Sequence, residues 1–180
     1  EELAVLREAG YTGLTIGIET GDDAALAFMN KGYAAQDIVA QCARLDAAGI
    51  AYAFFYLAGI SGKGHGIEGA RLTAAVCNQT RPSLIGANML TIYKNSELYQ
   101  EVIAGNWEEE TEIEKYQEIK ALVDGLEIPV EFAMLGASNP VMMQGRLPEQ
   151  RAQIIAALDR VIDEIGEDRL RHYRTNLKHL

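Results

Sequence analysis

An acidic side chain closes the first apolar segment of the sequence. Leu14–Glu19 is a short β-branched run that predicts a strand. A carboxylate in this position can accept hydrogen bonds from ligand hydroxyls or an ammonium group, whereas burial without partners would be costly. Lys31 follows after one predicted helix and could return to the same place. The placement is equally compatible with a strand-end cap or ion pair at Glu19 and with a solvated helix-end lysine at Lys31.

Glycines gather after the second apolar run, Ile50–Leu57. Gly59, Gly62, Gly64 and Gly66 would let the backbone approach a ligand closely. The segment lacks the Gly-Lys-Ser/Thr ending of a P-loop and the spacing of a dinucleotide fingerprint. The composition therefore favours a flexible loop or a close approach to a planar ligand over a phosphate site.

The histidines and cysteines form no metal-binding pattern. His65, His172 and His179 have no second histidine or carboxylate at metal-ligand spacing on a helix. Cys42 and Cys77 are too few and too far apart for a zinc or iron–sulfur ligand set, and both fall within predicted helices as core thiols. We predict no catalytic residue and no metal ligand in this chain.

Composition narrows the class of protein further. The 180 residues carry a formal net charge of −10 and are 48% hydrophobic, with a mean hydropathy of −0.06. The acidic balance argues against nucleic acid as the main partner. No apolar stretch reaches the roughly 18 residues of a membrane span. We expect a cytoplasmic protein without a membrane partner, and its substrate stays unknown.

Strand and helix signals alternate along the chain. Predicted strands begin near residues 14, 50, 84 and 128. Predicted helices cover residues 1–9, 22–29, 35–48, 67–80 and 96–104. Thr111 and Glu114 open a further helix with a capping box. The last two predicted helices cover residues 148–165, with Pro148 as the first helical residue, and the tail 167–180. Residues 136–147 are predicted as a loop.

This repeat predicts parallel strands joined by right-handed crossovers. Two α/β architectures fit the pattern, an open doubly wound sheet and part of a (β/α)₈ barrel. Four units are about half of a closed barrel. Since the sequence opens inside a predicted helix, we expect a fragment of a longer protein.

Gly13–Gly32 resembles a segment of the radical S-adenosylmethionine enzymes. In the branch of iron–sulfur oxidoreductases and oxygen-independent coproporphyrinogen oxidase-like proteins, an apolar strand ends Gly-x-Glu-(Ser/Thr)-Gly and the next helix ends Met-Asn-Lys-Gly. Here Gly17–Gly21 and Met29–Gly32 match both patterns at the expected separation.

Weaker matches follow along the chain. Gly59–Lys63 stands where the family has Gly-Leu-Pro-Gly-Glu, with Ser61 and Lys63 as departures, and Asn95–Tyr99 stands where Gly-Thr-x-Leu-Tyr is common. The resemblance runs from about Leu3 to Ile165. It implies the C-terminal half of a TIM-type (β/α) barrel in residues 1–135, followed by a loop and helical extension in residues 136–180.

The resemblance also implies roles for four cofactor-binding residues. Glu19 would accept hydrogen bonds from the ribose hydroxyls of S-adenosylmethionine, and Lys31 would pair with the methionyl carboxylate. Gly59 and Ile60 would present backbone and an apolar edge to the adenine. The family cleaves the sulfonium reductively with a [4Fe–4S] cluster and so forms a deoxyadenosyl radical.

The family's CxxxCxxC cluster loop is absent from this sequence. The resemblance therefore implies an enzyme in the parent protein and an inactive fragment here, which supplies part of the S-adenosylmethionine pocket. The alternative is a non-catalytic α/β ligand-binding or scaffold module. Truncation of a barrel would leave the edge of strand 14–19 unpaired, so we expect self-association there or rearranged loops over it.

Overall fold

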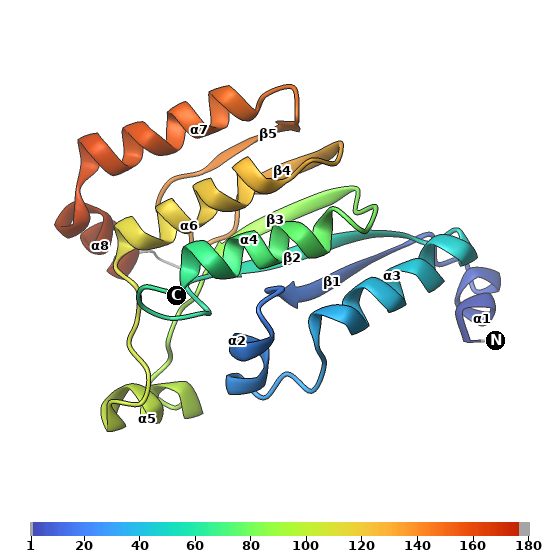
Figure 1. Ribbon diagram of the computed structural model, residues 1–180, viewed down its shortest axis with the longest axis horizontal. Coiled ribbons are helices and arrows are strands. Elements are labelled where there is room, and N and C mark those ends of the chain that lie inside the picture. The colour runs from blue at the N-terminus through green and yellow to red at the C-terminus, as the bar shows by residue number, and fades with distance from the viewer. Residues whose placement is uncertain (1, 177–180) are drawn as a thin grey trace.

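The four predicted parallel strands lie side by side in sequence order. The computed structural model describes residues 2–176, and its sheet has the strand order β1-β2-β3-β4-β5. The strands are β1 (Gly13–Glu19), β2 (Ala51–Ala58), β3 (Leu84–Met89), β4 (Val130–Met134) and β5 (Met143–Leu147). The first four are parallel, and β5 is antiparallel to β4. Figure 1 shows this arrangement.

Helices connect the parallel strands in the predicted alternation. They are α1 (Glu2–Glu8), α2 (Asp23–Phe28), α3 (Ala35–Ala48), α4 (Gly66–Cys77), α5 (Glu97–Ala104), α6 (Glu112–Gly125), α7 (Arg151–Arg160), the π-helix η1 (Val161–Ile165) and α8 (Glu167–Thr175). Several ends match their sequence signals. Gly49 and Gly105 adopt left-handed conformations after α3 and α5, and Thr111 and Glu114 form the predicted capping box.

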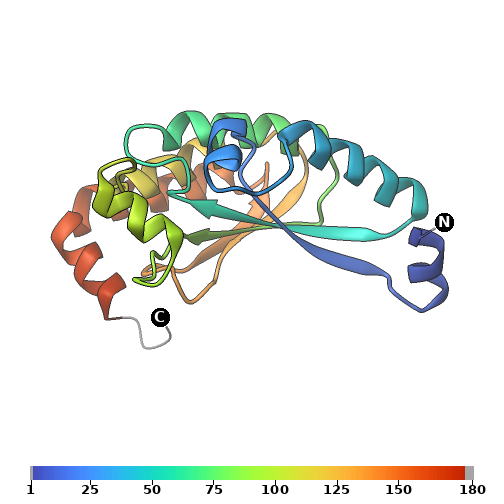
Figure 2. The same cartoon turned by 90° about the horizontal axis from the view of Figure 1, so that it is seen from below.

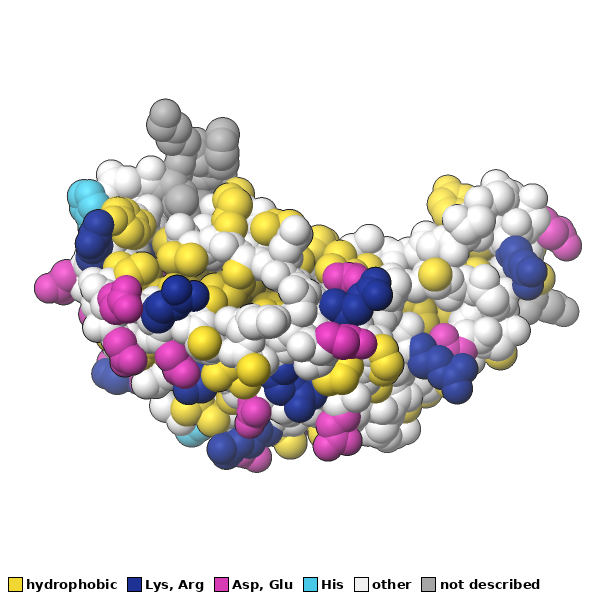
Figure 3. Space-filling model, turned by 90° about the horizontal axis from the view of Figure 1, so that it is seen from above, with side chains coloured by type: hydrophobic (Ala, Val, Ile, Leu, Met, Phe, Trp, Pro, Cys, Tyr) yellow, Lys and Arg dark blue, Asp and Glu magenta, His cyan; other side chains and the backbone are white. Residues whose placement is uncertain are grey.

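The two faces of the sheet differ. In β2, Tyr52, Phe54 and Tyr56 are buried beneath the helices, whereas Phe55 points to the other face and is 44% exposed. Helices α3, α4, α6 and α7 all lie on one face (Figure 2). The molecule has an arc-shaped outline, with hydrophobic side chains gathered along the hollowed side (Figure 3).

This one-sided cover distinguishes the two architectures that the sequence left open. A doubly wound sheet carries helices on both faces, whereas a barrel carries them only outside. The predicted α/β class with parallel βα units is therefore confirmed, as part of a TIM-type fold. Within residues 2–176, no helix has both the length and the hydrophobicity needed to cross a membrane.

Two local predictions near the C-terminus are wrong. The predicted loop 136–147 contains β5, which pairs with β4 and is held by an ion pair between Arg146 and Glu131 at 2.7 Å. Gly145 in its centre weakens the strand signal in the sequence. Pro148 precedes the helix rather than opening it, because residues 148–150 form a turn in which the N–H of Arg151 donates to the Pro148 carbonyl at 3.2 Å. The last four residues of the predicted tail helix lie outside the described residues.

Candidate functional site

The candidate residues meet at the carboxyl edge of the parallel strands. Glu19 ends β1, the glycine-rich segment 59–66 follows β2, and Met89 ends β3. Because neighbouring parallel strands run in the same direction, these three ends share one edge of the sheet. Ligands bind at this edge in both open α/β sheets and barrels.

Glu19 is held in an uncommon backbone conformation. Its φ of 61° lies in the left-handed region, and the pairing of β1 with β2 is irregular between Gly17 and Glu19. The carboxylate turns back over Gly17, where a Cβ atom would lie 3.1 Å from Glu19 Oε1. A non-glycine residue in this region costs about 1–3 kcal/mol and is found most often at functional sites.

Lys31 returns to Glu19, as its position after one helix allowed. The Lys31 Nζ donates to Glu19 Oε1 at 3.2 Å, and the two side chains are 31% and 24% exposed. Helix α2 between them begins at Asp22, whose carboxylate accepts from the N–H groups of Ala24 and Ala25. The structure therefore brings the two residues together as a partly exposed ion pair, the arrangement that the sequence also allowed for Glu19 without a ligand.

A tyrosine lies beside this pair and covers part of the sheet edge. The Tyr33 hydroxyl donates to the carbonyl oxygens of Gly17 at 3.1 Å and Ile18 at 3.3 Å. Burial raises the pKa of Tyr33, and the negative charge of Glu19 raises it further. Tyr33 thus remains a neutral hydrogen-bond donor at neutral pH.

Thr20 and Gly21 anchor the end of β1 to helix α4. The Thr20 and Thr73 hydroxyls lie 3.1 Å apart, and the N–H of Gly21 donates to Thr73 Oγ1 at 2.7 Å. A Cβ atom on Gly21 would lie 2.8 Å from Thr73 Cα, so the close approach requires glycine. The Thr-Gly part of the motif therefore packs the strand end against the helix.

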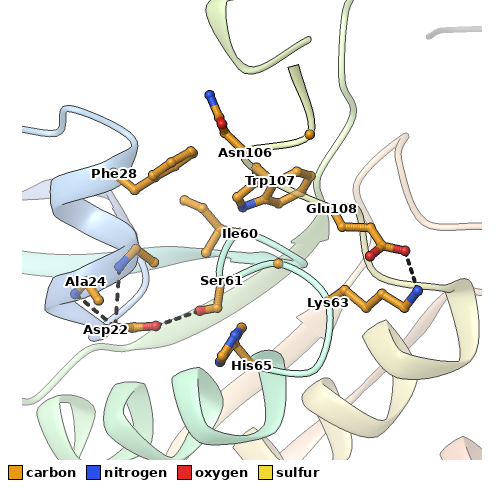
Figure 4. A pocket seen from close by; sticks show the side chains of 13 residues that line it. Asp22, Ala24, Phe28, Ile60, Ser61, Lys63, His65, Asn106, Trp107 and Glu108 are labelled. Atoms are coloured by element: carbon orange, nitrogen blue, oxygen red, sulfur yellow. Dashed lines mark hydrogen bonds and ion pairs between the residues drawn. The ribbon is translucent and has the colours of Figure 1, made fainter. Parts of the chain in front are cut away.

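The glycine-rich segment 59–66 forms one wall of a pocket of about 480 Å³. Figure 4 shows the rings of Phe28 and Trp107 pointing into the same space, with Ile60 between them. Ser61 donates to Asp22 at 2.9 Å, and Lys63 and Glu108 form an ion pair nearby. The remaining lining residues are Ala24, Ala25, Gly62, His65, Gly105 and Asn106.

Trp107 approaches the glycine segment directly. A Cβ atom on Gly62 would lie 2.8 Å from Trp107 Nε1, and Gly62 adopts a φ of 80°. In this structure, the planar group that approaches the segment is an indole ring of the chain itself, and the expected approach to a planar ligand stays a prediction.

The predicted site residues fall into two places. Glu19 and Lys31 form their ion pair outside the set of residues that line the pocket, whereas Ile60 lines it. The N–H of Gly59 donates to Glu118 Oε2 at 2.7 Å, beneath the pocket. The backbone N–H of Gly59 is therefore already hydrogen-bonded and is not available to donate to a ligand.

Sequence reasoning missed a set of buried charged residues under the same segment. Glu110, Glu118 and Lys115 are all buried in the core. Glu118 and Lys115 lie three residues apart on α6, a spacing that is typical of charged residues on an exposed helix face. Their burial depends on contacts with the segment 59–66 and with α8, which no local pattern reveals.

The two cysteines lie in the core, as predicted. Cys42 and Cys77 are free and buried, and burial raises their pKa to about 11 and about 12. Neither is an activated thiol. Within residues 2–176, no group of three or more His, Cys, Asp or Glu side chains is arranged to hold a metal ion.

The fold is similar to that of a known protein. No family model matches the sequence, and no curated protein matches it. Among solved structures, the chain is similar to Elp3 of the archaeon Methanocaldococcus infernus in an N-terminally deleted form, with 15% sequence identity and a TM-score of 0.66. The match covers 88% of this chain and 38% of that chain, so this chain spans well under half of the length of its structural neighbour. At this identity, the likeness shows a shared fold.

Proposed function

We propose that this chain is part of a radical S-adenosylmethionine iron–sulfur oxidoreductase and supplies one side of the S-adenosylmethionine pocket. The observation that carries the proposal is the strained Glu19 at the carboxyl end of β1, paired with Lys31 across helix α2. The likeness of fold to Elp3, itself a radical S-adenosylmethionine enzyme, supports it. The motif Gly-Ile-Glu-Thr-Gly and the later Met-Asn-Lys-Gly favour the coproporphyrinogen oxidase-like branch.

The ion pair has the chemistry that this ligand needs. S-adenosylmethionine carries ribose hydroxyls, which donate to a carboxylate, and a methionyl carboxylate, which accepts from an ammonium group. Glu19 and Lys31 are partly exposed, so both can exchange their mutual contact for ligand contacts without exposing a buried charge. The strained backbone of Glu19 and the capped helix α2 before Lys31 fix the two groups before the ligand arrives.

The adenine would be held by the glycine-rich segment. Ile60 offers an apolar side chain at the pocket wall. Gly59 lets the buried Lys115 side chain pack beneath the segment, since a Cβ atom there would lie 3.1 Å from Lys115 Cε. In the parent protein, a CxxxCxxC loop would hold the iron–sulfur cluster, which would supply the electron for cleavage of the sulfonium. The residues of this chain bind and orient the cofactor.

Binding of S-adenosylmethionine to this chain tests the site. We expect isothermal titration calorimetry to show binding that weakens about tenfold or more in Glu19→Gln and in Lys31→Met, since each loses a charge-assisted contact worth about 1.4 kcal/mol or more. Lys120→Met is the matched control, because Lys120 forms a comparably exposed ion pair with Asp159 elsewhere. Equal weakening in the control would contradict the assignment.

The reaction itself is tested on the parent protein. Anaerobic reconstitution of the full-length product with iron and sulfide, followed by reduction, should yield 5′-deoxyadenosine from S-adenosylmethionine. An open reading frame without CxxxCxxC upstream of this chain would exclude the chemistry.

The pocket beside Trp107 favours a second candidate function. Its aromatic and polar lining comes wholly from this chain, which suits a non-catalytic ligand-binding module. Under this alternative, S-adenosylmethionine would not bind. A planar ligand would occupy the pocket, and its binding would be weakened by Trp107→Ala but not by Glu19→Gln.

A further inference from the structure

Two buried carboxyl groups hold the two ends of the glycine-rich segment 59–66. Glu118 Oε2 accepts from the N–H of Gly59 at 2.7 Å, and Glu110 Oε1 accepts from the N–H of Gly66 at 2.9 Å. Both acids come from one stretch of chain, since Glu110 lies in the connector before α6 and Glu118 lies in the middle of that helix. Hydrogen bonds to buried carboxyl groups therefore hold both ends of the pocket wall.

The two carboxyl groups converge on one point. A Cβ atom on Gly66 would lie 2.1 Å from Glu110 Oε1 and 2.8 Å from Glu118 Oε2. Both side chains are removed from water. Two adjacent carboxylates in such surroundings cannot both remain ionised, so one proton is held between them.

In the described part of the chain, no cation forms an ion pair with either acid, although the charge of Lys115 partly offsets the rise in the pKa of Glu110 that burial causes. Lys115 is fully buried, but its Nζ binds Glu109 at 2.7 Å and Glu112 at 3.2 Å. Arg174 of α8 binds the same two acids, at 3.1 and 2.9 Å. Among the described residues, two cations thus face two other carboxylates, and the pair Glu110–Glu118 keeps a single negative charge.

The remaining groups around the pair are neutral or occupied. The Tyr56 hydroxyl of β2 donates to Glu118, and burial raises the pKa of Tyr56. Cys77 of α4 is a protonated thiol. Glu114 of α6 is engaged with Thr111 in the capping box. Burial, and then the charge of Glu110, raises the pKa of Glu118 well above its usual range.

We propose that Glu110 and Glu118 are positioning residues that share one proton, that this proton keeps the segment 59–66 fastened beneath the pocket, and that its loss releases the segment. A second negative charge would have to be hydrated, and water can reach the pair only if the segment lifts. The order of the pocket wall is therefore coupled to pH. This inference goes beyond the proposed function and does not depend on which ligand the pocket takes.

Hydrogen exchange of the segment's amides tests the coupling. We expect the protection factors of the Gly59 and Gly66 amides in the wild-type chain, corrected for intrinsic exchange, to fall by about tenfold or more between about pH 6 and about pH 9. Glu118→Gln keeps an acceptor for Gly59 and cannot ionise, so its protection should vary by less than about twofold over the same range. The exposed Glu131→Gln is the matched control and should behave as the wild type does.

The side-chain carboxyl carbon of Glu118 provides a second measurement that needs no variant. Its ¹³C chemical shift should report a protonated carboxyl group at neutral pH and titrate together with the loss of amide protection. Titration of Glu118 near its usual pKa, or equal pH dependence in Glu118→Gln and the wild type, would overturn the inference. Since neither readout involves S-adenosylmethionine, a failure to bind that ligand would count against the proposed function alone.

Discussion

Glu19 and Gly21 lie two residues apart in the sequence and have different roles. The left-handed conformation of Glu19 is strained, and its side chain reaches the edge where ligands gather. Gly21 contacts the backbone of α4 and has no room for a side chain. The Glu-Thr-Gly motif therefore combines one residue suited to ligand binding with two that fix its position, and within this motif Glu19 alone is a candidate for contact with a cofactor.

A charge-free substitution at Glu118 should stabilise the fold above acidic pH. The folded chain keeps a proton that the unfolded chain releases above about pH 4.3. Since the unfolded state binds fewer protons, the free energy of unfolding falls as pH rises from there towards the raised folded-state pKa, by up to about 1.4 kcal/mol per pH unit. Glu118→Gln removes this loss.

Urea unfolding at several pH values measures the effect. The midpoint of Glu118→Gln should exceed that of the wild type by a margin that grows from about pH 5.5 to about pH 8. A margin that stays constant with pH would contradict the prediction. In this variant the amide oxygen accepts from the N–H of Gly59, and the amide NH2 group faces the Tyr56 oxygen and can only donate to it. A lower midpoint throughout would therefore point to the lost acceptor of Tyr56 or to poor packing of the amide.

At the scale of elements, Arg174 of α8 binds the beginning of α6, where Glu167 of α8 also accepts from the N–H of Ile113 at 3.0 Å. Arg174 binds Glu109, Glu112 and the carbonyl oxygen of Leu90. Arg174→Met should cost about 3–5 kcal/mol, because it leaves Glu112 buried beside a single cation. We expect limited proteolysis to cut first within residues 167–176 of this variant. Arg171→Met removes an exposed pair with Glu167 and should cost less than about 1 kcal/mol, and equal sensitivity of the two variants would contradict the prediction.

The sequence predicted those elements whose signals are local. Helix α3 ends at Gly49 and α6 begins at the Thr111 capping box because each signal involves residues within one or two turns. β5 was missed because its stability comes from β4, a partner that the segment 143–147 does not itself encode. The buried pair Glu110–Glu118 was missed for the same reason, since its partners lie in β2 and the glycine-rich segment.

At the scale of the whole molecule, β1 is the exposed edge of the sheet. Within residues 2–176 it pairs only with β2. An apolar hollow of about 230 Å³ lies beside it, lined mainly by Ile16, Ile18, Tyr33, Ile38 and Cys42. The Tyr33 hydroxyl covers two carbonyl groups of this edge. The rest of β1 has the unpaired backbone groups of an edge strand.

We predict that the isolated chain self-associates through this edge. Sedimentation should show a mass that rises with concentration, and Ile16→Lys should shift the chain towards monomer, because a lysine on an edge strand opposes further pairing. Ile103→Lys, on the exposed surface of α5, is the matched control. A wild-type chain that stays monomeric at high concentration would contradict the prediction.

The position of Trp107 has a practical consequence. It is the single tryptophan of the sequence, and it lies on Gly62 at the pocket wall. The tryptophan emission of this chain, excited selectively over that of its eight tyrosines, therefore has one source. That source is in contact with the segment 59–66. The chain carries its own optical reporter, and changes in emission can be followed without attaching a label.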